Sequence, residues 1–196
     1  MPREIEIKFR ITDLNALTSA LRRLRFRQIA PPTHEMNALY DLPGQKLRNK
    51  GELLRLRKFG DTWTLTHKSK GTNTAHKVRI ELETPVANGP QMDAILRALG
   101  FSPTFRYEKF RAEWTDGTGH VVLDQTPIGN YGEIEGQPRW IDRTARALGI
   151  ARVDYITRTY ADLFFTWKRR VSSQASTMTF RDVGKAPPRL HRKRRA

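Results

Sequence analysis

The sequence predicts an α+β fold with a mainly antiparallel sheet, because segments with an apolar residue at every second position recur along the chain, while few segments show the helical repeat. Strand, helix and hairpin follow one another twice, so the sheet is expected to form two similar halves. A chain of 196 residues can bury a substantial core, and the absence of cysteine excludes disulfides and thiolate metal sites. We therefore expect one domain that folds without cross-links.

The first half opens with a strand. Residues 3–11 alternate strictly between charged and apolar side chains, which is the period of a half-buried strand. Thr12 or Asp13 can cap a helix over residues 14–24, whose leucines repeat at three- and four-residue intervals. Between residues 53 and 68 the period returns to two on both sides of a Gly-Asp turn, as expected for a β-hairpin.

The second half repeats this order. Residues 78–83 alternate as a strand, and residues 90–99 form a short predicted helix that ends at Gly100. Another alternating run, 107–114, leads through an Asp-Gly turn to an apolar strand at 121–124. A second hairpin is therefore expected here.

The last part of the chain changes character. A glycine-bounded strand is predicted at 133–135, and helices are predicted near 141–148 and 154–168. Beyond these helices apolar periodicity stops, and Ser, Thr, Pro and Arg dominate. We therefore expect a folded domain over residues 1–170 and a basic, disordered tail over 171–196.

The chain carries a large positive charge. Its formal net charge is +16, and residues 168–196 hold ten of the basic residues against one acidic residue, Asp182. Such an excess attracts phosphate-rich partners, and the basic tail is a candidate for weak contact with nucleic acid or polyphosphate. Because no apolar stretch has membrane-spanning length and the first residues are charged, we expect a cytoplasmic protein with no membrane partner.

The polar faces of the predicted strands carry a high density of charge. Residues two positions apart on a strand stand about 7 Å from each other on the same face. Paired carboxylates at that spacing can hold a divalent cation, and neighbouring Arg and Lys can bind phosphate oxygens. The acids are Glu4, Glu6, Glu81, Glu83, Asp124, Glu133 and Glu135, and the bases are Lys8, Arg55, Arg57, Lys68, Arg79, Lys109 and Arg111.

Any one of these pairs alone is more often part of a solvated sheet face with cross-strand ion pairs. Because such charged pairs recur in strand after strand, a solvated sheet face does not explain the whole set. If the sheet closes with the charges inside, each unpaired buried ion costs on the order of several kcal/mol. A hydrated channel that holds divalent cations and a polyanion avoids this cost, and we predict a channel of that kind.

The same residues form a recognisable pattern. The chain resembles the CYTH, or triphosphate tunnel metalloenzyme, family, whose Glu-x-Glu-x-Lys signature is present at residues 4–8. The resemblance extends over residues 3–167, and its motifs agree in order and spacing. They are Leu-Arg-x-Arg at 54–57, Leu-Thr-x-Lys at 65–68, Arg-x-Glu-x-Glu at 79–83, Lys-x-Arg at 109–111, an aspartate after an apolar strand at Asp124, and Glu-x-Glu at 133–135.

This resemblance implies an eight-stranded antiparallel β-tunnel with flanking helices, which binds a triphosphate chain with Mg²⁺ or Mn²⁺. It implies that the main metal ligands are Glu4, Glu6, Glu133 and Glu135, with Asp124 as a further metal-binding carboxylate. It also implies that Glu81 and Glu83 help to hold metals or an attacking water as catalytic residues. The implied phosphate path consists of Lys8, which is also assigned a catalytic role, Arg55, Arg57, Lys68, Arg79, Lys109 and Arg111.

Three functions remain open at this point. The first is metal-dependent hydrolysis of a phosphoanhydride bond in inorganic, thiamine or nucleoside triphosphate, and the second is conversion of ATP to cyclic AMP and pyrophosphate by a class IV adenylate cyclase. The third is a non-catalytic module that binds polyphosphate or RNA. The shared motifs do not separate these functions, nor do they decide between a monomer and a homodimer. The five histidines lack metal-ligand spacing and are expected in loops or on the surface.

Overall fold

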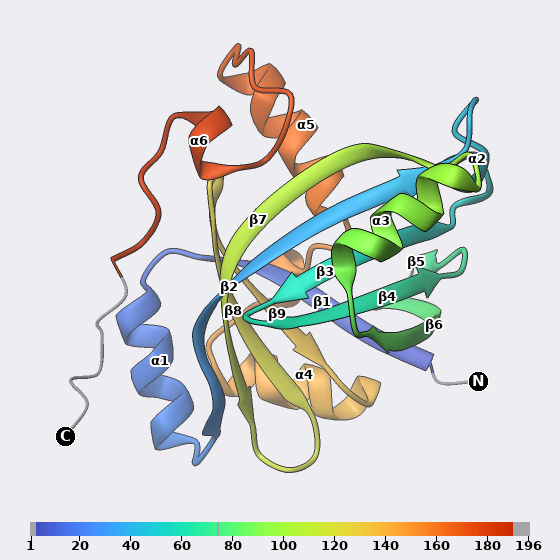
Figure 1. The fold of residues 1–196 in the computed structure, drawn as a ribbon. Coiled ribbons are helices and arrows are strands. Elements are labelled where there is room, and N and C mark those ends of the chain that lie inside the picture. Colours follow the sequence, from blue (N-terminus) through green and yellow to red (C-terminus); the bar gives the residue numbers. More distant parts are fainter. Residues whose placement is uncertain (1–2, 74, 190–196) are drawn as a thin grey trace, which may run out of the picture.

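Eight antiparallel strands close into a barrel in the computed structural model, which describes residues 3–73 and 75–189 (Figure 1). The order around the barrel is β1-β9-β8-β7-β2-β3-β4-β6, and β6 pairs again with β1, so the predicted eight-stranded tunnel is confirmed. A two-residue strand, β5, adds to the side of β6. The bounds are β1 (Arg3–Ile11), β2 (Arg27–Asp41), β3 (Leu53–Phe59), β4 (Thr62–Lys68), β5 (Thr72–Asn73), β6 (Lys77–Val86), β7 (Ser102–Thr115), β8 (His120–Thr126) and β9 (Gly129–Glu135).

The helices lie outside the barrel (Figure 1). They are α1 (Leu14–Arg23), α2 (Lys46–Lys50), α3 (Gly89–Ala98), α4 (Pro138–Ala147), α5 (Tyr160–Arg170) and α6 (Phe180–Val183), with a 3₁₀ turn at Arg152–Asp154. In the part of the chain that the structure describes, none of them is long and apolar enough to cross a membrane.

The predicted helix starts are confirmed in one case and wrong in another. Asp13 caps α1 by accepting a hydrogen bond from the Ala16 amide, as expected. The helix predicted from residue 154 instead begins at Tyr160, because Thr159 forms a reciprocal capping box with Asp162. Extended chain precedes the cap, and Ile156 forms a β-bridge with β1.

The strand β2 is absent from the sequence prediction, although it is the longest strand of the barrel. Its first part contains Pro31 and Pro32, which resemble a strand break. Irregular register between β2 and β7 around Ala30 accommodates the prolines without ending the strand. Beyond them, Ala38 and Tyr40 point to an apolar cluster outside the barrel.

The apolar faces of the strands point outward and are covered by helices. The largest cluster packs Ile7, Phe9 and Ile134 against α1 and α4, a second packs β7 and β9 against α5, and a third involves α3. The hydrophobic core therefore surrounds the barrel, and the charged strand faces are left to line its interior.

The segment after α5 is folded, so the predicted disorder is wrong for residues 171–189. Met178 is fully buried and Phe180 nearly so, and the Phe180 ring packs at a tilt of 53° beside Phe110 of β7, with the ring centroids 5.8 Å apart. The Met178 amide donates to the Arg106 carbonyl, and the Phe180 amide donates to the Glu108 carboxylate at 2.7 Å. These contacts join distant parts of the chain, so local composition does not reveal them. The basic run at 192–195 lies outside the described residues.

Replacing Met178 with Ala should destabilise the protein by about 3 kcal/mol, because it empties a fully buried site. Urea unfolding measures this loss, and the exposed Val171→Ala serves as the control, with a change within about 0.5 kcal/mol. Equal stability of the two variants would show that the segment is not docked.

Candidate functional site

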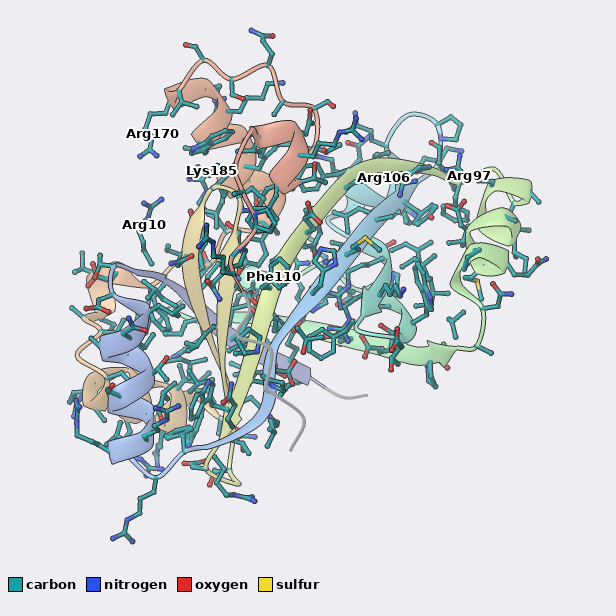
Figure 2. The ribbon with its side chains drawn as sticks, turned by 60° about the vertical axis from the view of Figure 1, so that its left-hand side comes forward. Arg10, Arg97, Arg106, Phe110, Arg170 and Lys185 are labelled. Carbon is teal, nitrogen blue, oxygen red and sulfur yellow. The ribbon has the colours of Figure 1, made fainter. Side chains whose placement is uncertain are left out.

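The barrel encloses a charged cavity of about 410 Å³. Its walls come from the inner faces of the strands, because alternate residues of each strand point to opposite sides of the sheet. Thirteen of the fourteen charged residues that the sequence singles out line this cavity: Glu4, Glu6, Lys8, Arg55, Arg57, Lys68, Arg79, Glu81, Glu83, Lys109, Arg111, Glu133 and Glu135. The fourteenth, Asp124, is fully buried behind the wall. Other basic side chains, among them Arg10, Arg170 and Lys185, are exposed on the outside (Figure 2).

Lysines and carboxylates neutralise each other across β1 and its neighbours. Lys8 forms an ion pair with Glu133, the residue opposite it on β9. Lys68 of β4 lies 2.7 Å from a Glu4 oxygen and 2.9 Å from a Glu81 oxygen. These pairs join residues up to 125 positions apart, so only the closed barrel brings them together.

A second group of ion pairs belongs to the arginines of β3. Arg57 lies 3.1 Å from a Glu83 oxygen, and Arg55 lies 3.5 Å from Glu83 and 3.7 Å from Glu81. Thr66 also donates a hydrogen bond to Glu83 at 2.7 Å. The Glu83 carboxylate is therefore held at a fixed place on the wall.

Two fully buried carboxylates support the cations of β7 from behind. Asp124 accepts hydrogen bonds from Lys109 at 2.9 Å, from Arg111 at 2.6 and 2.8 Å, and from the Tyr160 hydroxyl at 2.6 Å. Glu35 lies 3.4 Å from Lys109 and 3.6 Å from Arg111. These contacts favour a positioning role for Asp124, because its oxygens already bind cations of the protein.

The pKa shifts of the buried acids and lysines agree with a network whose members are charged. Burial alone would raise the pKa of Glu6, but Lys8 and Lys77 outweigh it and lower that pKa to about 2. The same competition lowers the pKa of Glu133 well below its usual value through Arg111 and Lys8. Burial opposes the charge of Lys8, yet Glu133 and Glu6 raise its pKa.

Glu135 is the exception. It lies directly opposite Glu6 in the pairing of β1 with β9. Burial of its carboxyl group and the nearby carboxylates of Glu4 and Glu6 raise its pKa to about 7. The residue as a whole is still partly accessible to solvent. Burial and the neighbouring carboxylates also raise the pKa of Glu4, despite its contact with Lys68. This part of the tunnel therefore holds more negative charge than its lysines neutralise.

The donor set at this place fits a hard divalent cation. Glu4, Glu6 and Glu135 offer carboxylate oxygens, the ligands that Mg²⁺ and Mn²⁺ prefer, and their mutual repulsion is the kind that a cation relieves. Within the described residues no three such groups converge at metal-binding distances. The reason is visible in the contacts, because Lys68 and Lys77 hold Glu4 and Glu6.

Several residues of the site are absent from the sequence prediction. Glu35 lies in the missed strand, although its alternation with Met36 and Ala38 is a readable signal. Lys77 lies two residues before Arg79 and Glu113 two residues after Arg111, so each continues the charged face of its strand, and both line the tunnel. Tyr160 and His120 also line the tunnel. His120 is exposed, as expected, but it lies opposite Glu135 in the pairing of β8 with β9.

The CYTH domain family model matches residues 2–160 of the chain, which therefore belongs to the CYTH family. A curated relative, adenylate cyclase CyaB from Aeromonas hydrophila, is 23% identical over 171 residues, covering 82% of this chain and 87% of the relative.

Solved structures share the fold. A Pyrococcus horikoshii protein superposes with a TM-score of 0.71 at 22% identity, covering 82% of this chain and 98% of its own. HpAC1 from Hippeastrum, whose structure revealed a dominant triphosphatase activity, gives a TM-score of 0.61 at 19% identity over 83% of this chain and 95% of its own. The proteins that this chain is similar to thus include one named as an adenylate cyclase and one with a reported triphosphatase activity.

Replacing Glu35 with Gln should cost about 3 kcal/mol at pH 7, because it removes one of the two buried carboxylates that neutralise Lys109 and Arg111 and leaves Asp124 alone to do so. Burial would raise the pKa of Glu35, but Lys109 and Arg111 lower it to about 2, so its contribution is present above pH 4.5 and disappears as the pH falls toward 2. Urea unfolding between pH 3 and 7 should therefore show a flatter pH dependence in E35Q than in the wild type.

The exposed Asp61→Asn is the matched control and should follow the wild-type profile within about 0.5 kcal/mol. An E35Q variant with wild-type stability and wild-type pH dependence would contradict the role of Glu35.

Proposed function

We propose that this protein is a divalent-metal-dependent triphosphatase that hydrolyses a terminal phosphoanhydride bond. The observation that carries the proposal is the lining of the tunnel, where cations and carboxylates from six of the eight barrel strands, β1, β3, β4, β6, β7 and β9, surround one cavity. The dominant triphosphatase activity of the related Hippeastrum structure supports hydrolysis over cyclisation.

The cations of the tunnel would bind the triphosphate oxygens. Two guanidinium nitrogens, Nε of Arg55 and Nε of Arg79, are buried and have no hydrogen-bond acceptor among the residues that the structure describes, and phosphate oxygens would supply one. Lys8, Arg57, Lys68, Lys109 and Arg111 would complete the path. Asp124 and Glu35 would keep Lys109 and Arg111 oriented toward it.

Substrate binding would exchange partners within the network. Phosphate oxygens would replace Glu4 and Glu133 as acceptors for Lys68 and Lys8, which frees those carboxylates. Glu4, Glu6, Glu133 and Glu135 would then hold Mg²⁺ or Mn²⁺, which neutralises phosphate charge and lowers the pKa of bound water.

The proposed reaction is a hydrolysis at the terminal phosphorus atom. A water oxygen attacks the terminal phosphorus, the bond to the bridging oxygen breaks, and orthophosphate and a diphosphate leave. Glu81 and Glu83 would orient that water and accept its proton, since Arg55, Arg57 and Lys68 fix both carboxylates at the wall. Arg55 and Arg111 would stabilise the charge that develops on the phosphoryl oxygens.

The second candidate is adenylate cyclisation, which the name of the Aeromonas relative favours. In that reaction a ribose hydroxyl replaces water as the nucleophile and pyrophosphate leaves, so the same cations would serve a triphosphate bound in a different position.

Product analysis separates the candidates. With Mg²⁺ or Mn²⁺ we expect orthophosphate from tripolyphosphate, thiamine triphosphate or ATP, measured by chromatography. Cyclic AMP with pyrophosphate would establish the cyclase, and tight binding without turnover would establish a non-catalytic polyphosphate- or RNA-binding module.

Glu135→Gln and Glu4→Gln should each reduce metal-dependent turnover at least 100-fold without lowering thermal stability. Removing either charge relieves repulsion among the carboxylates, so folding is not impaired, while a metal ligand is lost. Steady-state kinetics over a Mn²⁺ titration measures the effect, with the exposed Asp154→Asn as the control. Wild-type kinetics in both glutamine variants would refute the assignment.

A further inference from the structure

A basic groove of about 730 Å³ lies outside the tunnel, between α2, α5 and the chain that follows α5. Its basic residues are Arg48, Arg158, Lys168 and Arg169, and its single acid is Asp162. Three of the four basic residues are exposed, and within the described residues none of the four forms an ion pair with a carboxylate. The groove therefore presents unneutralised positive charge.

Contacts at the start of α5 occupy the one carboxylate of the groove and hold one of its cations in place. The Asp162 carboxylate accepts hydrogen bonds from the Thr159 amide and hydroxyl at 3.0 and 2.6 Å, so it is committed to the helix cap. Arg158 donates to the Asp162 carbonyl at 3.0 Å and to Thr166, which fixes its guanidinium beside the helix. A fixed cation of this kind binds an anion with little loss of side-chain entropy.

A smaller chamber of about 260 Å³ adjoins both the tunnel and the groove. It shares Leu39, Arg79 and Thr159 with the tunnel wall and Arg48 and Phe165 with the groove. Three aromatic residues, Tyr40, Phe105 and Phe165, belong to its lining, and Phe165, which is 38% exposed, presents an accessible ring. A flat, largely apolar ring fits such walls by stacking.

The three spaces thus follow one another as a phosphate-binding tunnel, an aromatic chamber and a basic groove. Inorganic triphosphate would leave the chamber empty, and a longer polyphosphate would place negative charge beside the carboxylates that line it, Asp41, Glu52 and Asp162. A plain nucleoside triphosphate would fill tunnel and chamber but leave the groove unused. The order matches a nucleotide that carries phosphate on both sides of its nucleoside.

We propose that the substrate is a nucleoside 5′-triphosphate with a further phosphate on its 3′ oxygen, bound with the triphosphate in the tunnel, the base in the chamber and the 3′ phosphate in the groove. This inference rests on the triphosphatase function proposed above. The groove is mostly built by residues 162–174, which lie beyond residue 160, where the family match ends, so it is an addition to the shared tunnel.

The 3′ phosphate can belong to the 5′ end of an RNA chain or to a free 3′-phosphorylated nucleotide. Two substrates distinguish these sources: a 5′-triphosphorylated RNA of ten nucleotides and ATP phosphorylated at its 3′ oxygen. A higher kcat/KM for the RNA assigns the groove to an RNA end, and an equal or lower value assigns it to the free nucleotide.

The test is the ratio of kcat/KM for 3′-phosphorylated ATP to that for ATP. We expect at least a tenfold preference in the wild type, which falls to less than twofold in the double variant Lys168→Gln, Arg169→Gln. The control is Arg143→Gln, Arg146→Gln on α4, which lies at the opposite end of the molecule from α5 (Figure 1) and should keep the full preference.

Two further measurements separate this inference from the triphosphatase function. Turnover of tripolyphosphate by each variant reports on the tunnel alone. If the wild type hydrolyses tripolyphosphate but shows no preference for the 3′-phosphorylated nucleotide, the inference about the groove is overturned and the proposed triphosphatase function stands. If nothing is hydrolysed, fluorescence anisotropy with labelled 3′-phosphorylated ATP and labelled ATP decides the inference. Equal affinities for the two would overturn it.

Discussion

The constraint on which the structure depends is the neutralisation of charge inside a closed barrel. Carboxylates and cations from six of the eight barrel strands line one cavity, and each buried ion needs a partner there. Asp124 and Glu35 hold Lys109 and Arg111 from behind, while Glu4, Glu81 and Glu133 engage Lys68 and Lys8 at the wall. The proposed function follows from the same constraint, because a bound metal and a triphosphate would replace these partners without leaving a charge exposed to apolar surroundings.

The apolar part of the fold is arranged around this charged interior. Strand faces that point outward pack against helices, so the barrel wall is stabilised from outside and its inner face is free to carry charge. The segment after α5 belongs to this outer layer, since Met178 and Ala175 join the cluster of Phe105, Tyr107 and Tyr160. Tyr160 connects the two layers, because its ring packs in that cluster while its hydroxyl donates to Asp124.

Much of this was predictable from period-two charge patterns. The run at residues 4–8 predicted both the first strand and which of its faces lines the cavity, and this run together with similar ones predicted thirteen residues of the cavity wall. The missed strand contains two prolines, so Glu35 was lost with it. The ion pairs themselves are beyond such reasoning, because Lys8 meets Glu133 only through the pairing of β1 with β9, strands that lie far apart in the sequence. Docking of Met178 on β7 is equally non-local, which explains why the segment resembled a disordered tail.

The account is tested most directly by a crystal structure with Mn²⁺ and a non-hydrolysable imidotriphosphate. It predicts anomalous scattering from Mn²⁺ inside the tunnel beside Glu4, Glu6 and Glu135, with Lys68 and Lys8 turned from their carboxylates to phosphate oxygens. Metal and anion bound on the outer surface, with the internal ion pairs unchanged, would contradict it.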